Sequence, residues 1–263
     1  MSKLAAQDKF LDLSDYGRPF GKYIANSLKH TRFTPIHVTL LFGISGLIAI
    51  GCILNGYYIL AGLFIILKSI IDAADGELSR IKNTPSYTGR FLDSVFDIIL
   101  NFLFLMSICF VSKTTIWPTL LAFVGIQLQG TLYNYYYVIL RNVSVGGDKT
   151  SQVFENKRPT ALPGESQKWV NIMFILYTVL YGVFDKIIHF LDQDAYQVKM
   201  FPNWFMTLLS IYGLGFQLLI IALRLSLNLI EYIVPFFILF TIFIFVLIGI
   251  RKYFVKVINV TSL

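Results

Sequence analysis

Four aspartates and one arginine lie close together where two long apolar runs of the chain meet. They are Asp72, Asp75, Arg80, Asp93 and Asp97. Ionisable residues inside apolar, membrane-type segments are costly, and they usually serve a function. Four neighbouring carboxylates would repel one another unless cations neutralised them, and carboxylate oxygens suit Mg²⁺ or Mn²⁺. The residue types therefore predict a site for hard divalent cations.

Their spacing places these residues on one face of each of two consecutive helices. The two i, i+4, i+8 series are Asp72, Gly76 and Arg80 on the first helix, and Gly89, Asp93 and Asp97 on the second. A short turn joins the helices, so they are antiparallel neighbours and both series can face one cleft. Two metal ions roughly 3.5–4 Å apart suit substitution at phosphorus. Arg80 offers a planar donor fork for a phosphate, and the glycines let a ligand approach the helix backbone.

The composition indicates a membrane protein. Of 263 residues, 56% are hydrophobic and only 14% are charged, whereas soluble domains carry about a quarter charged residues. The net charge of +7 fits the positive-inside bias and contact with anionic headgroups, and no nucleic acid is expected as a partner. Cys52 and Cys109 lie in apolar runs and are expected to behave as small hydrophobes.

The apolar runs predict an all-α, polytopic transmembrane helical bundle with six or seven spans. The expected spans are residues 34–54, 57–82, 87–111, 117–140, 169–190, 204–223 and 229–250, and the parity of the last two stays open. An amphipathic helix within residues 10–31, with Pro19 in its first turn, is expected to lie in the membrane interface, in preference to an ordinary solvated helix. We therefore divide the chain into an interfacial segment, 1–33, and a transmembrane domain, 34–263.

Positive charge in the N-terminal segment and in the polar connection 141–168 places these parts on the cytoplasmic side. The turn at 82–86 falls on the same side. We therefore expect a multi-pass integral membrane protein whose active site lies at the cytoplasmic face, which would be the inner membrane in a bacterium.

The pattern Asp-x2-Asp-Gly-x2-Ala-Arg-x8-Gly-x3-Asp-x3-Asp resembles the signature of the CDP-alcohol phosphotransferases. The chain matches it from Asp72 to Asp97 except at Ser79, where the family usually has Ala. The start of the first span, with Thr34, Pro35 and Thr39, is similar to the family as well, although Ile36 stands in place of the usual Asn.

The resemblance implies roles for individual residues. Two metal ions would bind to Asp72, Asp75, Asp93 and Asp97, and Asp97 would also be the catalytic base that deprotonates the acceptor hydroxyl. The CDP moiety would contact Gly76, Ser79, Arg80, Ser86 and Gly89. A homodimer is compatible with this family.

The implied function is phospholipid synthesis, in which a phosphatidyl group passes from CDP-diacylglycerol to a polar alcohol acceptor with release of CMP. Two alternatives stay open: transfer from CDP-choline or CDP-ethanolamine to diacylglycerol or ceramide, and a divalent-cation transporter that uses the same carboxylates.

Four basic residues are candidates for binding the acceptor: Lys68, Arg141, Lys157 and Arg158. Lys68 lies one turn before Asp72, so pairing with that carboxylate and packing are alternative roles for it. For the other three, an ordinary positively charged cytoplasmic loop is the more frequent explanation.

Overall fold

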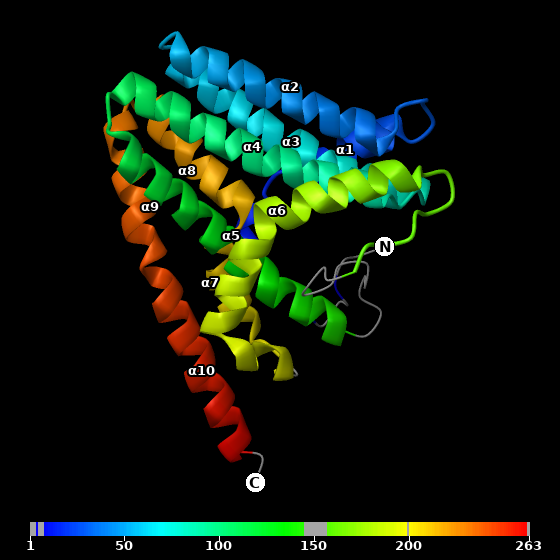
Figure 1. Ribbon diagram of the computed structural model, residues 1–263, viewed down its shortest axis with the longest axis vertical. Coiled ribbons are helices and arrows are strands. Elements are labelled where there is room, and N and C mark those ends of the chain that lie inside the picture. The colour runs from blue at the N-terminus through cyan, green and yellow to red at the C-terminus, as the bar shows by residue number, and fades with distance from the viewer. Residues whose placement is uncertain (1–3, 5–7, 145–156, 199, 262–263) are drawn as a thin grey trace.

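The chain folds into an assembly of helices, and the described residues form no strand. The computed structural model describes the backbone of residue 4 and of residues 8–144, 157–198 and 200–261, and it describes side chains as far as Phe254. In Figure 1, helices α2, α3 and α4 run side by side, and α9 and α10 follow one another along a different edge to the C-terminus. The all-α class predicted from the sequence is therefore confirmed.

Three helices carry the signature and its flank, and their ends agree with the sequence. They are α2 (Pro35–Leu54), α3 (Tyr58–Lys82) and α4 (Tyr87–Ser112). The Thr34 hydroxyl caps α2 by accepting from the His37 N–H, and Pro35 occupies the first turn. Helix α3 ends at Asn83, whose φ of +52° is the left-handed conformation that stops a helix. The predicted turn between α3 and α4 is thus confirmed.

The remaining long helices are α5 (Ile116–Val143) and α6 (Gln167–Leu191). Both agree with predicted spans to within a few residues. The following part of the chain departs from the prediction. Residues 204–223 do not form one helix, because α7 (Asn203–Leu209), the short helix η4 (Ser210–Tyr212) and α8 (Leu214–Ser226) are joined with a bend of 50°. Gly213 adopts an extended backbone at this bend.

The last apolar run consists of η5 (Ile230–Tyr232), α9 (Ile233–Thr241) and α10 (Phe243–Thr261). By length and composition, four segments among the described residues can cross a membrane: α2, α4, α6 and residues 230–254. The bent pair of α7 and α8 would make a fifth. The expected six or seven spans are therefore not confirmed, since the charged α3 and the polar α5 do not meet the same criterion.

The N-terminal segment forms a 3-10 turn, η2 (Leu13–Asp15), and then α1 (Arg18–Leu28) with Pro19 in its first turn. Helix α1 buries Gly21 and Ala25, while Phe20 is 62% exposed. A Cβ on Gly21 would lie 2.9 Å from backbone atoms of Ala73 and Ala74, so α1 packs directly on the backbone of α3. A helix at this place was expected, and its location in the membrane interface stays a prediction.

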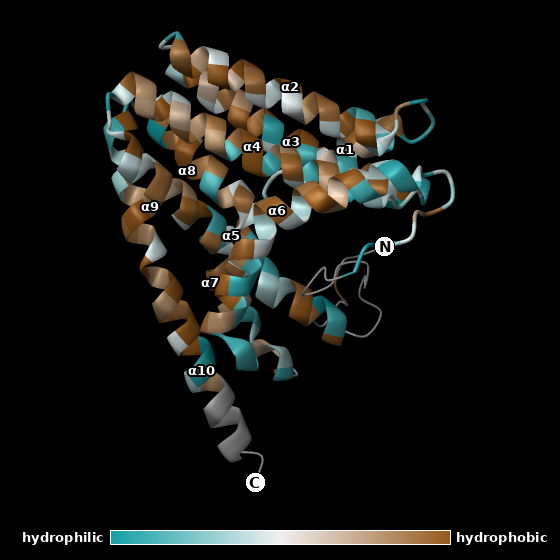
Figure 2. Ribbon diagram, viewed as in Figure 1, coloured by the Kyte–Doolittle hydropathy of each residue, from teal (hydrophilic) through white to brown (hydrophobic). Residues whose placement is uncertain are grey.

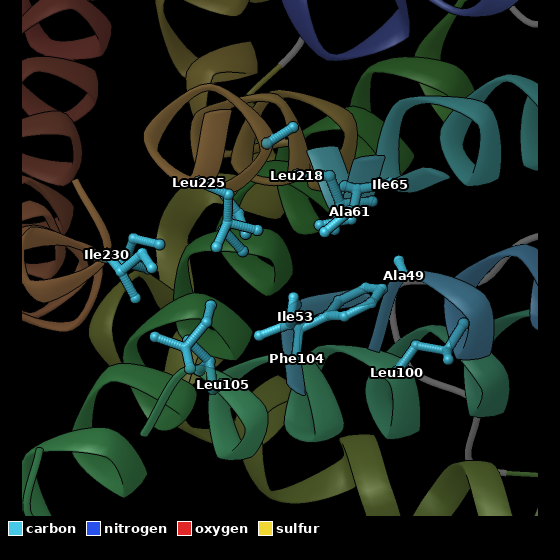
Figure 3. Close-up of a cluster of buried hydrophobic side chains, with 14 of the residues drawn as sticks. Ala49, Ile53, Ala61, Ile65, Leu100, Phe104, Leu105, Leu218, Leu225 and Ile230 are labelled. Atoms are coloured by element: carbon cyan, nitrogen blue, oxygen red, sulfur yellow. The ribbon is translucent and has the colours of Figure 1, made fainter. Parts of the chain in front are cut away.

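A hydrophobic core joins helices from both halves of the sequence. Figure 3 shows part of it, with side chains from α2, α3, α4 and α8 converging around Phe104. Hydrophobic residues line most of α2 and α9, whereas hydrophilic residues gather near α1 and the adjacent ends of α3, α4 and α6 (Figure 2). One of the places where polar residues gather is therefore where the ends of the signature helices meet the N-terminal segment.

A second core holds a fully buried ion pair between Asp192, just after α6, and Arg251 on α10. Arg251 Nε donates to Asp192 Oδ2 at 2.7 Å, and the Tyr136 hydroxyl donates to the same oxygen. Asp192 is buried, and its pair with Arg251 ties the end of α6 to α10.

Candidate active site

The signature residues open into a cavity of about 410 Å³ between α3, α4, α5, α6 and α8. Its walls include all four signature aspartates together with Gly76 and Arg80. The turn η2 closes another side through Asp12, Ser14 and Asp15. The antiparallel helices α3 and α4 therefore bring their two polar series to one cleft, as the spacing predicted.

Asp72, Asp75 and Asp93 form the tightest part of the cluster. One carboxylate oxygen from each lies within 4.8 Å of the others, which is an arrangement that can hold a metal ion. Thr39 Oγ1 on α2 donates to Asp75 Oδ2 at 2.6 Å and orients that carboxylate. Asp93 Oδ1 is buried and has no hydrogen-bond partner among the described residues. Such an oxygen is expected to have a cation or water as its partner, so these residues fit a divalent ion.

Asp97 stands apart from this triad. Its Oδ1 accepts a short hydrogen bond from Lys68 Nζ, which also donates to Asp72 Oδ2 at 3.1 Å. Lys68 is only 1% exposed, and its nitrogen lies 4.6 Å from the centre of the Phe42 ring. Of the roles considered for Lys68, the structure shows the ion pair with Asp72, and it adds Asp97 as a second partner.

Gly76 leaves the space above its backbone open towards Arg80. A Cβ at this position would meet only the Arg80 guanidinium, at 3.6 and 3.7 Å. Arg80 Nη2 forms an ion pair with Glu77 Oε1 at 2.9 Å, and Glu77 is also 3.8 Å from Arg18 Nε. Arg80 is therefore held beside the cavity with its guanidinium over the open glycine.

Three other predicted nucleotide contacts, Ser79, Ser86 and Gly89, lie outside the residues that line the cavity. Ser79 Oγ donates to Thr84 O at 3.0 Å and so closes the turn after α3. Ser86 Oγ accepts from the Gly89 N–H at 2.8 Å as the cap of α4, and it donates to Glu165 Oε1 at 2.7 Å. These side chains hold the turn between α3 and α4 in the described structure.

Glu165 is the least expected residue in this region. Its carboxylate also accepts the N–H groups of Thr88 at 2.8 Å and Tyr87 at 3.1 Å, so it occupies the N-terminus of α4. Burial alone would raise the pKa of the Glu165 carboxyl, but the hydrogen bonds from Thr88, Ser86 and Tyr87 outweigh burial and the pKa is lowered. The loop before α6 is thereby fastened to the signature turn.

The basic residues considered for the acceptor divide into two groups. Arg141 lines the cavity and is buried, with its guanidinium 5.9 Å from the centre of the Tyr137 ring. Lys157 and Arg158 do not line it. An uncharged donor also lines the cavity: Gln127 is 5% exposed, and its Nε2 has no hydrogen-bond partner among the described residues.

Sequence reasoning missed Glu165 and the wall formed by η2. The Tyr133 hydroxyl donates to Asp12, and the Leu13 N–H donates to Ser210 Oγ at 2.9 Å, so this wall is attached to both α5 and η4. No local signal indicates these contacts, because their partners lie more than a hundred residues away. Thr39 belongs to the start of α2 that is similar to the family in sequence, but the sequence did not predict its contact with Asp75.

A comparison with protein families extends the likeness beyond the signature. The family model for CDP-alcohol phosphatidyltransferases matches residues 32–192, more than half of the chain. The chain belongs to this family. It is therefore a transferase that acts on a CDP-alcohol, and divalent metal ions are general in such phosphatidyltransferases. The match covers α2 to α6 and ends at Asp192. A comparison with curated proteins found no match.

Proposed function

We propose that this phosphatidyltransferase makes a phospholipid by transferring a phosphatidyl group from CDP-diacylglycerol to a polar alcohol, with release of CMP. The observation that carries the proposal is the triad of Asp72, Asp75 and Asp93, which opens into a cavity shared with Arg80 and Asp97. The family match supports a CDP-alcohol as donor, and it gives no support to a divalent-cation transporter.

Four aspartates would hold two Mg²⁺ or Mn²⁺ ions in this proposal. The triad fits one ion, as the unpartnered Asp93 Oδ1 indicates, and Asp97 would contribute to the second. Bound divalent ions would neutralise phosphate charge and stabilise the entering and leaving oxygens.

The nucleotide would lie over Gly76, where the missing Cβ allows its phosphates to approach the helix backbone. Arg80 would then donate to a phosphate oxygen in place of part of its contact with Glu77. Ser79, Ser86 and Gly89 would shape this end of the site, and they could contact the nucleotide only if the turn and Glu165 rearrange.

Asp97 would act as the base. Its second oxygen would accept the proton of the acceptor hydroxyl as that oxygen forms a bond to the β-phosphorus, while the bond from phosphorus to the CMP oxygen breaks. Lys68 supports this role because it fixes one oxygen of Asp97 and leaves the other to the cavity.

The acceptor would enter beside Gln127 and Arg141, which line the cavity on α5. Gln127 offers an unpartnered amide donor for a hydroxyl or carbonyl oxygen, and Arg141 offers a cation for an acidic group. Lys157 and Arg158 would act, if they contribute, from the loop outside the cavity.

In the membrane, we propose that α3 and α5 cross together with the apolar helices that they pack against, so that six or seven segments span. Their charged side chains would face the cavity instead of lipid, which lowers the cost of burying them. Residues 1–33 would form the interfacial segment, residues 34–263 the transmembrane domain, and the site would open at the cytoplasmic face.

The test is an assay of CMP release by the purified protein in lipid nanodiscs with Mg²⁺. CDP-diacylglycerol would be supplied with serine, glycerol 3-phosphate, inositol or inositol phosphate, and CDP-choline with diacylglycerol would be assayed in parallel. We expect release of CMP only from CDP-diacylglycerol, and loss of that release in Asp72→Asn. Turnover of CDP-choline alone would replace the proposed donor, and turnover that survives in Asp72→Asn would refute the metal assignment.

A further inference from the structure

Lys68 is a buried cation that contacts two of the four signature aspartates, and it lies outside the family signature. It joins two helices, because its ammonium contacts Asp72 on α3 and Asp97 on α4. The Phe42 ring of α2 covers it, and its side chain is almost fully enclosed. An ammonium enclosed in this way stays where its partner charges are, since leaving them would be costly.

The contact between Lys68 and Asp97 makes the four carboxylates unequal as ligands for a metal ion. Asp72, Asp75 and Asp93 present oxygens that lie close enough to share an ion, and Asp97 is not part of this group. Asp97 instead has one oxygen bonded to Lys68. A divalent ion that binds through Asp97 must therefore approach a fixed positive charge. The same ammonium also contacts Asp72 of the triad at 3.1 Å, but the triad adds the oxygens of Asp75 and Asp93, and Asp93 Oδ1 is buried and unpartnered among the described residues.

We propose that Lys68 is a positioning residue whose ammonium keeps Asp97 from binding a divalent ion in the absence of nucleotide. Only the triad then binds such an ion tightly. The second ion binds when the phosphates of the nucleotide add negative charge and offset the ammonium. Metal loading is then ordered: Asp97 contributes the oxygen that Lys68 contacts to the second ion only in the nucleotide complex, and its other oxygen stays available as the base. This inference rests on the proposed function.

A purely structural role for Lys68 leads to a different expectation. If the ammonium only neutralises buried carboxylates during folding, its removal should lower thermal stability without changing how many ions bind or in which order. Metal stoichiometry therefore separates the two roles, and it can be measured without turnover.

The experiment is a titration with Mn²⁺, followed by the electron paramagnetic resonance of the free ion, on the protein in nanodiscs with and without cytidine diphosphate. The wild type is expected to bind one ion tightly alone and two with cytidine diphosphate. In Lys68→Met, a second ion should bind without nucleotide at least about 10-fold more tightly than in the wild type, as expected from the loss of one nearby charge. Lys82→Met is the matched control, since Lys82 ends the same helix and donates to Thr31 O and Phe33 O instead of a carboxylate.

Several results would overturn the proposal. One is the binding of two ions of equal affinity to the wild type without nucleotide, and another is an unchanged, wild-type binding pattern in Lys68→Met. If Lys68→Met does not fold, the wild type and Asp97→Asn still decide, because Asp97→Asn should retain the single tight ion and never gain a second. Failure of the wild type to bind Mn²⁺ under either condition would instead refute the metal-dependent function on which the inference rests.

Discussion

The glycine in the first half of the signature gives the sharpest test of how the site takes its nucleotide. In Gly76→Ala, the added methyl group would meet only the Arg80 guanidinium, at ordinary contact distances of 3.6 and 3.7 Å. Nothing in the fold has to move. Because alanine is a better helix former than glycine by about 1 kcal/mol, α3 should become slightly more stable.

Nucleotide binding should change in the opposite direction. The methyl group fills the space through which a phosphate would approach the backbone of α3, next to the guanidinium that would bind it. We expect the dissociation constant for CMP in the presence of Mg²⁺ to rise by at least about 10-fold, or about 1.4 kcal/mol. An unchanged or raised unfolding temperature together with weaker CMP binding would distinguish loss of contact from loss of fold.

Gly51→Ala is the matched control, because it is also a glycine-to-alanine change inside a helix, here α2, and no atom lies within 4 Å of the added Cβ. It should gain similar helix stability and leave the affinity for CMP unchanged. Thermal unfolding in detergent and CMP titration would be measured on both variants. If Gly76→Ala binds CMP with wild-type affinity, the close-approach argument is wrong.

Three further predictions concern other parts of the molecule. Asp97→Asn should lower kcat by about 10²–10⁴-fold while measurable CMP affinity remains. If Asp97→Asn loses CMP affinity as completely as Asp72→Asn does, Asp97 is primarily a metal ligand. Glu165→Gln should speed hydrogen exchange at the Tyr87 and Thr88 amides by about 10-fold at pH 7. Because the pKa of Glu165 is lowered in the fold, its carboxylate stabilises the start of α4 fully at neutral pH. The protection that the wild type has over the variant should be lost only as pH falls below the ordinary carboxyl range, and protection that persists there would refute this role. Arg251→Met should cost about 3–5 kcal/mol of stability, since it leaves the Asp192 carboxylate buried without its cation, and Asp192→Asn combined with it should restore part of that loss in thermal unfolding.

The sequence predicted the central part of this fold because the information is local there. The i, i+4, i+8 series on α3 and α4 place Asp72 and Asp93 on facing helices once a short turn joins them, and the turn appears where Pro85 and its neighbours break the apolar run. Helix starts such as Thr34-Pro35 are local signals as well.

The rest depended on contacts between distant segments. The 50° bend between α7 and α8 occurs where Ser14 packs against Gly213 and Gly215, so tightly that a Cβ on Gly215 could not fit beside the Ser14 carbonyl. The apolar sequence of residues 204–223 does not predict this contact with Ser14. Glu165 likewise belongs to a polar connection in the sequence, and only folding brings it to the start of α4.

The N-terminal segment both encloses the polar cavity and supports one of the helices that form it. The turn η2 lies at the bend before α8 and presents Asp12 and Asp15 to the cavity, while α1 next to it packs on the α3 backbone through Gly21. The same short stretch therefore closes the cavity on one side and supports the helix that carries Asp72 and Asp75 on the other. Because its contacts reach α3, α5 and α8 together, a displacement of this segment would open the cavity and disturb the aspartates at once, which gives the enzyme a structural reason to fold its N-terminal residues into the site.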